Sequence, residues 1–135
     1  MRLRTGWGLL GLLCFVSIPP LAVAADLTVN YITPAELLAR LDSPEVVVID
    51  VSPPSVYATY DRKIKGARRE LPGRASEWGR QYPPEKTLVL YCHCSQEFAS
   101  RQVAEILHLL GHPRVLVLQG GWEAWVKNGY PTDPK

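Results

Sequence analysis

Short runs of aliphatic and β-branched residues alternate with amphipathic segments along most of the chain. Val46–Asp50 and Thr87–Tyr91 are apolar over most of their length, and turn-forming or charged residues bound them. Apolar runs of this length are typical of strands that are buried on both faces of a parallel sheet. A third strand of this kind is predicted over Arg114–Leu118, and a weaker one near Ala67–Leu71.

Helical patterns lie between these strands. Thr33-Pro34-Ala35-Glu36 forms a capping box with proline in the first helical position, which predicts a helix from about Pro34 to Leu41. A longer amphipathic helix is predicted from Phe98 to Leu110. Shorter helical segments are predicted over residues 53–60, 75–81 and 122–127. Strands that alternate with helices predict an α/β fold: a small parallel sheet with helices on both faces.

The first 25 residues differ in character from the rest of the chain. Two arginines precede an apolar run from Trp7 to Ile18, and Ala22-Val23-Ala24 supplies small residues before a cleavage point. This order is the pattern of a secretory signal peptide, and the apolar run is shorter than the roughly 20 residues of a membrane span. We predict a cleaved signal peptide over 1–25 and a single exported domain over 26–135, in the bacterial periplasm and without stable membrane contact. The alternative is a signal that is kept as an anchor.

Charge argues against a nucleic-acid partner. The chain has 135 residues, of which 47% are hydrophobic and 21% charged, as in ordinary globular domains. Two of the 15 basic residues, Arg2 and Arg4, lie in the N-terminal segment, whereas all 13 acidic residues lie after it. The predicted domain therefore carries equal numbers of both signs. It lacks the basic excess that binding to nucleic acid requires.

Candidate chemistry lies directly after the second strand. The predicted domain has two cysteines, Cys92 and Cys94, one residue apart. A disulfide across so short a separation closes almost no loop and contributes little stability. A cysteine between the end of a strand and the start of a helix faces backbone N–H groups, which favour the thiolate. The pair therefore predicts thiol chemistry, not a structural crosslink.

From about residue 32 to 135 the chain resembles the rhodanese-type sulfurtransferases. Ile49-Asp50-Val51 looks like the first core strand of that family with its Asp, and Ile64-Lys65-Gly66-Ala67 is similar to the family segment that ends in Ile-Pro-Gly-Ala. Cys92 occupies the nucleophile position that opens a six-residue loop. The most specific match is the signature Leu-x-Gly-Gly-Trp-x-x-Trp-x-x-x-Gly-Tyr-Pro over residues 118–131.

The resemblance implies an activity and a set of roles. In that family a cysteine thiolate takes a sulfane sulfur from a donor, becomes a persulfide and passes the outer sulfur to a nucleophilic acceptor. Cys92 is then the catalytic nucleophile, and Cys94 is a candidate resolving thiol. Backbone N–H groups of the loop would bind the persulfide: those of His93, Ser95, Gln96, Glu97 and Phe98. The expected partners are a small sulfur donor and a thiol acceptor, such as a protein thiol, and no cofactor is implied.

The loop departs from the usual family pattern. The common loop has Gly in fourth place and Arg in sixth, followed by Ser or Thr, where this chain has Ser95, Glu97 and Phe98. An acid in place of the Arg predicts weak activity toward anionic thiosulfate. Phosphatases and arsenate reductases of this fold need a Cys-x5-Arg loop, and Phe98 stands at the position of that Arg. Two alternatives remain: a non-enzymatic interaction module and a thiol redox-sensing module.

The sequence also contains a spacing that resembles a zinc site, which helix geometry excludes. With the two cysteines, His108 and His112 produce a spacing that superficially suggests zinc ligands. However, His108 lies near the far end of a helix about 20 Å long, at 1.5 Å per residue, and His112 lies beyond it. These side chains cannot meet the cysteines at one ion, so no metal site is predicted.

Overall fold

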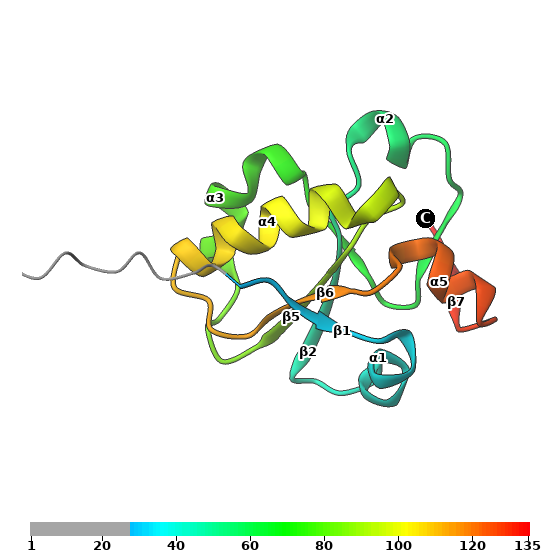
Figure 1. Cartoon of the computed structure of the whole chain (residues 1–135), viewed down its shortest axis with the longest axis horizontal. Coiled ribbons are helices and arrows are strands. Elements are labelled where there is room, and N and C mark those ends of the chain that lie inside the picture. The colour runs from blue at the N-terminus through cyan, green and yellow to red at the C-terminus, as the bar shows by residue number, and fades with distance from the viewer. Residues whose placement is uncertain (1–27) are drawn as a thin grey trace, which may run out of the picture.

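The computed structural model of the chain describes residues 28–135, so the predicted signal peptide lies outside the described residues. The centre is a five-stranded parallel sheet (Figure 1). Its strands, in spatial order, are β1 (Asn30–Ile32), β6 (Val115–Leu118), β5 (Thr87–Tyr91), β2 (Val46–Asp50) and β4 (Arg68–Arg69). The two long buried strands predicted from the sequence are confirmed at their predicted boundaries.

Helices cover both faces of this sheet. One face packs against α3 (Ala75–Trp78) and α4 (Phe98–Leu109), and the other against α1 (Pro34–Arg40) and α5 (Gly121–Lys127) (Figure 1). Shorter elements complete the layers: α2 (Pro54–Tyr57) and the 3-10 turns η1 (Pro72–Arg74), η2 (Gly79–Gln81) and η3 (Ser95–Glu97). The predicted α/β fold is confirmed. Within residues 28–135 no helix is long and apolar enough to cross a membrane.

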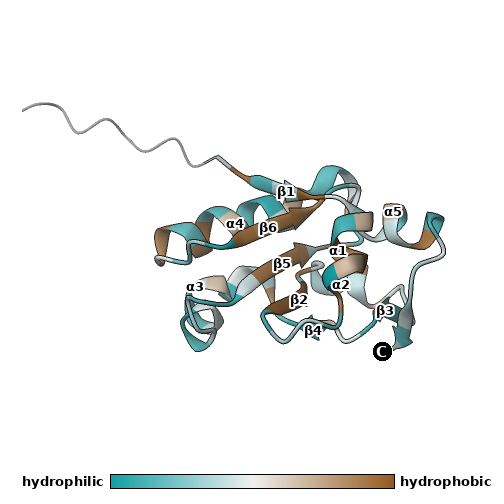
Figure 2. Ribbon diagram, turned by 90° about the horizontal axis from the view of Figure 1, so that it is seen from below, coloured by the Kyte–Doolittle hydropathy of each residue, from teal (hydrophilic) through white to brown (hydrophobic). Residues whose placement is uncertain are grey.

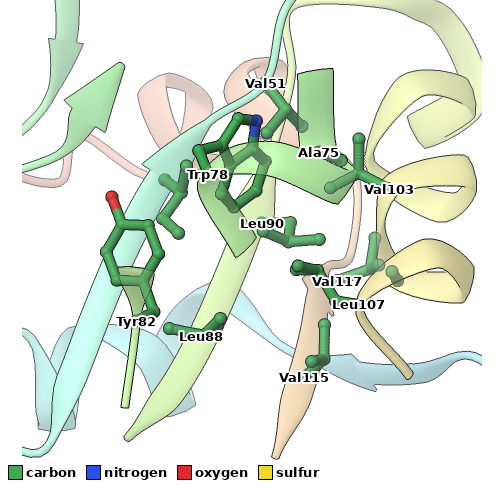
Figure 3. Packing of buried hydrophobic residues seen from close by; sticks show 12 residues of the cluster. Val51, Ala75, Trp78, Tyr82, Leu88, Leu90, Val103, Leu107, Val115 and Val117 are labelled. Atoms are coloured by element: carbon green, nitrogen blue, oxygen red, sulfur yellow. The ribbon is translucent and has the colours of Figure 1, made fainter. Parts of the chain in front are cut away.

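Strand β5 supplies side chains to both hydrophobic clusters of the domain. Leu88 and Leu90 belong to the cluster under α3 and α4, which Figure 3 shows together with Leu107. Val89 and Tyr91 point to the opposite face. All four strand residues are fully buried, and the central strands are the most hydrophobic part of the ribbon in Figure 2. A strand with no solvent-facing side needs no polar alternation, which explains the continuous apolar run in the sequence.

Local signals determine most helix ends. The capping box forms as predicted, because Thr33 Oγ1 accepts the Glu36 N–H at 3.2 Å and Glu36 Oε2 accepts the Thr33 N–H at 2.9 Å. The helix predicted over residues 75–81 is instead divided into α3 and the tighter turn η2. Pro83-Pro84 follow immediately and cannot continue a helix, so the segment closes in a 3-10 turn.

Three short strands were not predicted. They are β1, and the antiparallel pair β3 (Arg62–Ile64) and β7 (Thr132–Pro134), which forms a separate two-stranded sheet. The strand predicted near Ala67–Leu71 is reduced to the two residues of β4. These segments carry mostly polar side chains, so their sequences lack the pattern of a buried strand. They become extended because a partner strand is available in the folded chain.

Candidate active site

The chain leaves the sheet at the carboxyl end of β5 and forms a loop before α4. This loop, residues 92–97, surrounds a pocket of about 260 Å³ together with Gly120, Trp122 and Glu123. Gln96 and Glu97 both adopt positive φ, 55° and 51°. Adjacent non-glycine residues in the left-handed region are uncommon and occur mainly at functional sites. Turns that combine right-handed and left-handed residues can direct successive N–H groups toward an anion.

The two cysteines of the loop form a disulfide in this structure. Cys92 and Cys94 are bonded through their sulfur atoms, with 5.2 Å between their Cα atoms. Cys92 is buried, with 1% of its surface exposed, whereas Cys94 is partly exposed. Both line the pocket. The structure therefore represents the oxidised form of the loop, with the more accessible sulfur on Cys94.

His93, between the cysteines, anchors the loop to the core. Its side chain is fully buried. Its ring stacks on Trp122 at a centroid distance of 4.5 Å and lies 3.9 Å from the ring of Tyr60. The His93 N–H donates to Ser52 Oγ at 3.0 Å, and this hydroxyl donates to Asp50 Oδ1 at 2.6 Å. The loop is thus tied to the end of β2 by a relay of two hydrogen bonds.

Asp50 is the charged end of that relay. His93 Nε2 lies 3.5 Å from Asp50 Oδ2, and an Arg69 guanidinium nitrogen lies 4.0 Å from Oδ1. Burial acts to raise the pKa of Asp50, but the nearby His93 ring and two hydrogen bonds from Ser52 outweigh it and hold that pKa below its usual range. Burial and the Asp50 charge raise the pKa of Tyr91, so its phenol stays protonated. Asp50 is therefore a buried carboxylate beneath the loop.

A glycine turn closes the loop from the other side. Gly120 donates its N–H to Glu97 Oε1 at 2.6 Å, and Trp122 donates its N–H to the Cys92 carbonyl at 3.2 Å. A Cβ on Gly121 would lie 2.8 Å from the same Cys92 oxygen, and Gly121 has φ +53°. Gly121 is thus required by close contact with the loop, whereas a Cβ on Gly120 would lie 2.5 Å from Ala124 Cβ within α5. Glu97, which the sequence suggested as a charge and as a member of the N–H cradle, also holds the loop to this turn through its side chain.

The structure brings six of the seven predicted site residues, Cys92 to Glu97, around one pocket. Phe98 is different: it begins α4, is 63% exposed and lines a neighbouring groove along that helix. Two amides of the predicted N–H cradle already have acceptors, because His93 donates to Ser52 and Phe98 donates to the Ser95 carbonyl. The other predicted cradle residues, Ser95, Gln96 and Glu97, all line the pocket.

Among the residues of this site that were not assigned to it from the sequence, three surround His93. Ser52, Tyr60 and Trp122 contact His93 from three separate segments. The Asp-x-Ser spacing at the end of β2 is a local signal for a side chain that bonds the backbone two residues on, and Ser52 N–H does donate to Asp50 Oδ1 at 2.8 Å. No local pattern points to Tyr60, whose contact depends on the tertiary fold.

The distal histidines lie elsewhere. His112 Nε2 is 2.7 Å from the Gly79 carbonyl, and His108 Nδ1 is 3.1 Å from the His112 carbonyl. In the described part of the chain, no group of three His, Cys, Asp or Glu side chains is placed to hold a metal ion.

Comparison with known proteins identifies the family. The model of the rhodanese-like domain matches residues 33–128, which is most of the described chain. The chain belongs to the rhodanese-like domain family. Like this rhodanese-like protein, a sulfurtransferase of Allochromatium vinosum is a short chain: the two are 31% identical over 106 residues, covering 76% of this chain and 94% of the other.

Longer proteins also contain a similar unit. A thiosulfate sulfurtransferase of Pseudomonas aeruginosa is 28% identical over 133 residues, covering 84% of this chain and 47% of the other. The rhodanese-like protein thus spans about half the length of that relative. Among solved structures, a full-length protein from Lactobacillus plantarum superposes with a TM-score of 0.70 at 22% identity, covering 78% of this chain and 88% of the other. This likeness shows the shared fold.

Proposed function

We propose that this rhodanese-like protein is a sulfurtransferase that carries sulfane sulfur as a persulfide on Cys92. The position of Cys92 is the observation that supports this most directly. It follows β5 directly and lines the 260 Å³ pocket, in a loop with two adjacent left-handed residues. Such a site favours a thiolate and the anionic persulfide derived from it. The names of two relatives, both sulfurtransferases, support the same activity.

The proposed cycle begins from the reduced loop. The Cys92 thiolate attacks the sulfane sulfur of a donor, whose leaving group departs with the electron pair of the broken bond. An acceptor thiolate then attacks the outer sulfur of the persulfide, and the electron pair of that bond returns to Cys92. Because both sulfurs are paired in the disulfide, a thiol must first reduce the oxidised form before this cycle can start.

The charges around the pocket bear on the choice of donor. Glu97 and Glu123 both line it, and among its lining residues in the described chain there is no lysine or arginine. Carboxylates at the mouth of a pocket repel a dianion such as thiosulfate. We therefore expect weak turnover of thiosulfate and better turnover of small alkyl persulfides, whose sulfane group carries at most a single charge. The acceptor is a thiol, either of a small molecule or of a protein.

Intact-mass measurement after exposure of the reduced protein to polysulfide tests this function. The unmodified chain and Cys94→Ala should each gain one sulfur atom, because both retain the nucleophile. Cys92→Ala should gain none and should keep its fold. Equal loading of Cys92→Ala would remove Cys92 from the proposed role.

The disulfide favours a second candidate function, a thiol redox-sensing module. Peroxide would oxidise Cys92 to a sulfenic acid, which Cys94 would capture as the disulfide with release of water. In alkylation mass spectrometry, mild peroxide should give the disulfide in the unmodified chain and sulfinic acid on Cys92 in Cys94→Ser. If sulfinic acid forms equally fast in both, Cys94 is not a resolving thiol.

We also propose that the domain acts after export, in the periplasm of a bacterium. The signal-like pattern of residues 1–25 and the disulfide both support this, since disulfides persist in oxidising compartments. N-terminal sequencing of the protein recovered from a periplasmic fraction should begin near Asp26. Recovery of the full-length chain in the membrane fraction would instead identify a retained anchor.

A further inference from the structure

We propose that the oxidised form has an activity of its own: its disulfide captures hydrosulfide and converts it to protein-bound sulfane sulfur. Conversion of hydrosulfide to sulfane sulfur is a two-electron oxidation, and a disulfide is a two-electron oxidant. In this structure the bond between Cys92 and Cys94 lies in the wall of the pocket, where a small nucleophile can reach it. The reduced-loop cycle proposed above does not use this bond.

The two sulfurs differ in a way that selects the point of attack. Cys92 is 1% exposed, whereas Cys94 is partly exposed, so a nucleophile in the pocket meets the sulfur of Cys94 first. The leaving group is then Cys92, at the base of the loop. Backbone N–H groups in a loop that contains left-handed residues at the start of a helix favour the thiolate that forms there. Exposure and charge stabilisation therefore both favour attack on the sulfur of Cys94 with Cys92 as the leaving group.

The step balances without any further reactant. An electron pair of hydrosulfide forms a new bond to the sulfur of Cys94, and the Cys92–Cys94 bond breaks with its electron pair on Cys92. The sulfide sulfur is oxidised to the sulfane level, and the disulfide is reduced. The Cys92 thiolate then attacks the outer sulfur, which leaves a persulfide on Cys92 and a thiolate on Cys94. Onward delivery from Cys92 rests on the sulfurtransferase function proposed above.

The loop is built so that the two sulfurs remain close after the bond opens. His93, between them, has a fully buried side chain stacked on Trp122, and its N–H is held by Ser52. Each cysteine is therefore joined directly to an anchored residue. The short distance between their Cα atoms, 5.2 Å, permits transfer of the outer sulfur from Cys94 to Cys92.

The pocket also favours reaction with hydrosulfide over reaction with larger thiols. Its volume of about 260 Å³ and the carboxylates of Glu97 and Glu123 disfavour thiols that are bulky and carry carboxylates themselves, such as glutathione. Hydrosulfide is a two-atom anion with a single charge. We therefore expect Glu123→Gln to raise the rate of disulfide cleavage by glutathione more than the rate of cleavage by hydrosulfide. The fold-increase with glutathione should be about three times the fold-increase with hydrosulfide.

The test uses the full chain carrying Cys14→Ser, so that Cys92 and Cys94 are its only thiols. Oxidised protein is mixed with one equivalent of sulfide, quenched with an alkylating agent and examined by intact mass. Apart from the alkyl groups, it should gain the mass of one molecule of hydrogen sulfide. The reduced protein, given the same sulfide solution, should gain no sulfur, which also excludes contaminating polysulfide as the source of the sulfur.

Cys94→Ser separates this inference from the proposed sulfurtransferase function. This variant cannot form the internal disulfide, so it should retain no sulfur from sulfide, yet its Cys92 should still load one sulfur from polysulfide. If oxidised protein is cleaved by sulfide without retaining sulfur, or if Cys94→Ser retains as much as the unmodified loop, hydrosulfide capture is wrong. If Cys94→Ser fails with polysulfide, the sulfurtransferase proposal fails instead.

Discussion

At the residue scale, Asp50 shows how a buried charge can serve the loop. Its carboxylate is almost fully buried, yet three groups surround it: the Ser52 hydroxyl, the His93 ring and the Arg69 guanidinium. A buried carboxylate without such partners would be neutralised by protonation. With them it stays ionised and holds Ser52 in the orientation that accepts the loop amide of His93.

Asp50→Asn should change how stability depends on pH. The pKa of Asp50 is lowered in the folded chain from its unfolded value of about 3.9. Its stabilising contribution is therefore complete above that value and is lost as the pH falls through the lowered folded pKa. In urea unfolding from about pH 7 down to pH 2, the free energy of unfolding should fall more steeply for the unmodified chain than for Asp50→Asn.

Asp42→Asn, at an exposed carboxylate, is the matched control. Parallel curves for Asp50→Asn and the unmodified chain would contradict the prediction.

Glu97→Gln removes the charge of Glu97 and keeps its hydrogen-bond acceptor. A glutamine can still accept the Gly120 N–H through its amide oxygen, so the loop should stay in place while one negative charge leaves the pocket. We expect kcat/KM for thiosulfate to rise about tenfold, equivalent to about 1.4 kcal/mol, and the gain to shrink at high salt. Steady-state kinetics with thiosulfate and a neutral donor measure this. An equal gain with the neutral donor would show that charge is not the cause.

At the element scale, the site is a contact between two turns that are distant in the sequence. The loop after β5 lies against the glycine turn before α5, joined by the Glu97–Gly120 and Cys92–Trp122 hydrogen bonds. The turn has no space for a side chain on Gly121. The reactive loop therefore depends on the start of α5 for its shape.

Gly121→Ala should disturb the loop more than the fold. The added Cβ would lie 2.8 Å from the Cys92 carbonyl at a positive φ, which costs about 1–3 kcal/mol. The fraction of Cys92 that takes up sulfur should decline by more than the fraction of folded protein declines. Gly73→Ala is the matched control, because nothing lies within 4 Å of the Cβ it adds. Denaturant unfolding and persulfide mass measurements on both variants decide the question; similar effects in both would contradict the role of this contact.

The elements that the sequence predicted correctly share one physical property. Most residues of β2 and β5 are buried, on both faces of the sheet, so burial dictates their apolar runs, and α1 has a complete capping box. β3 and β7 carry residues such as Lys63 and Asp133, which fit a strand or a loop equally well. Their extended form depends on pairing between segments about 70 residues apart. No pattern within either segment indicates that pairing.

At the scale of the whole molecule, the sheet joins two hydrophobic clusters into one cooperative unit. Neighbouring residues of β5 belong to different clusters, so neither cluster can form without this strand. The same long-range organisation limits what the sequence could reveal of the site. Cys92 was recognisable from its place between a strand and a helix. The contacts of His93 with Ser52, 41 residues away, and with Tyr60 were not.

Leu90→Ala should therefore destabilise the entire domain in one transition. Leu90 is fully buried at the centre of the sheet, and truncation there costs about 2–5 kcal/mol. Leu109→Ala, on the same domain but 73% exposed, should cost less than about 0.5 kcal/mol. Trp78 reports on one cluster and Trp125 on the other, so near-UV circular dichroism and fluorescence should give coincident transitions. Separate transitions would show that the clusters unfold independently.

The shortness of β4 has a consequence for how copies of this protein meet one another. An outer strand exposes unpaired N–H and C=O groups, and a second molecule can add a strand there and begin aggregation. β4 offers only two residues, Arg68 and Arg69, whose guanidinium groups lie over the rings of Tyr82 and Tyr57. Positive charge on so short a segment repels an identical strand. This border of the sheet therefore offers little to strand addition by a second copy of the chain.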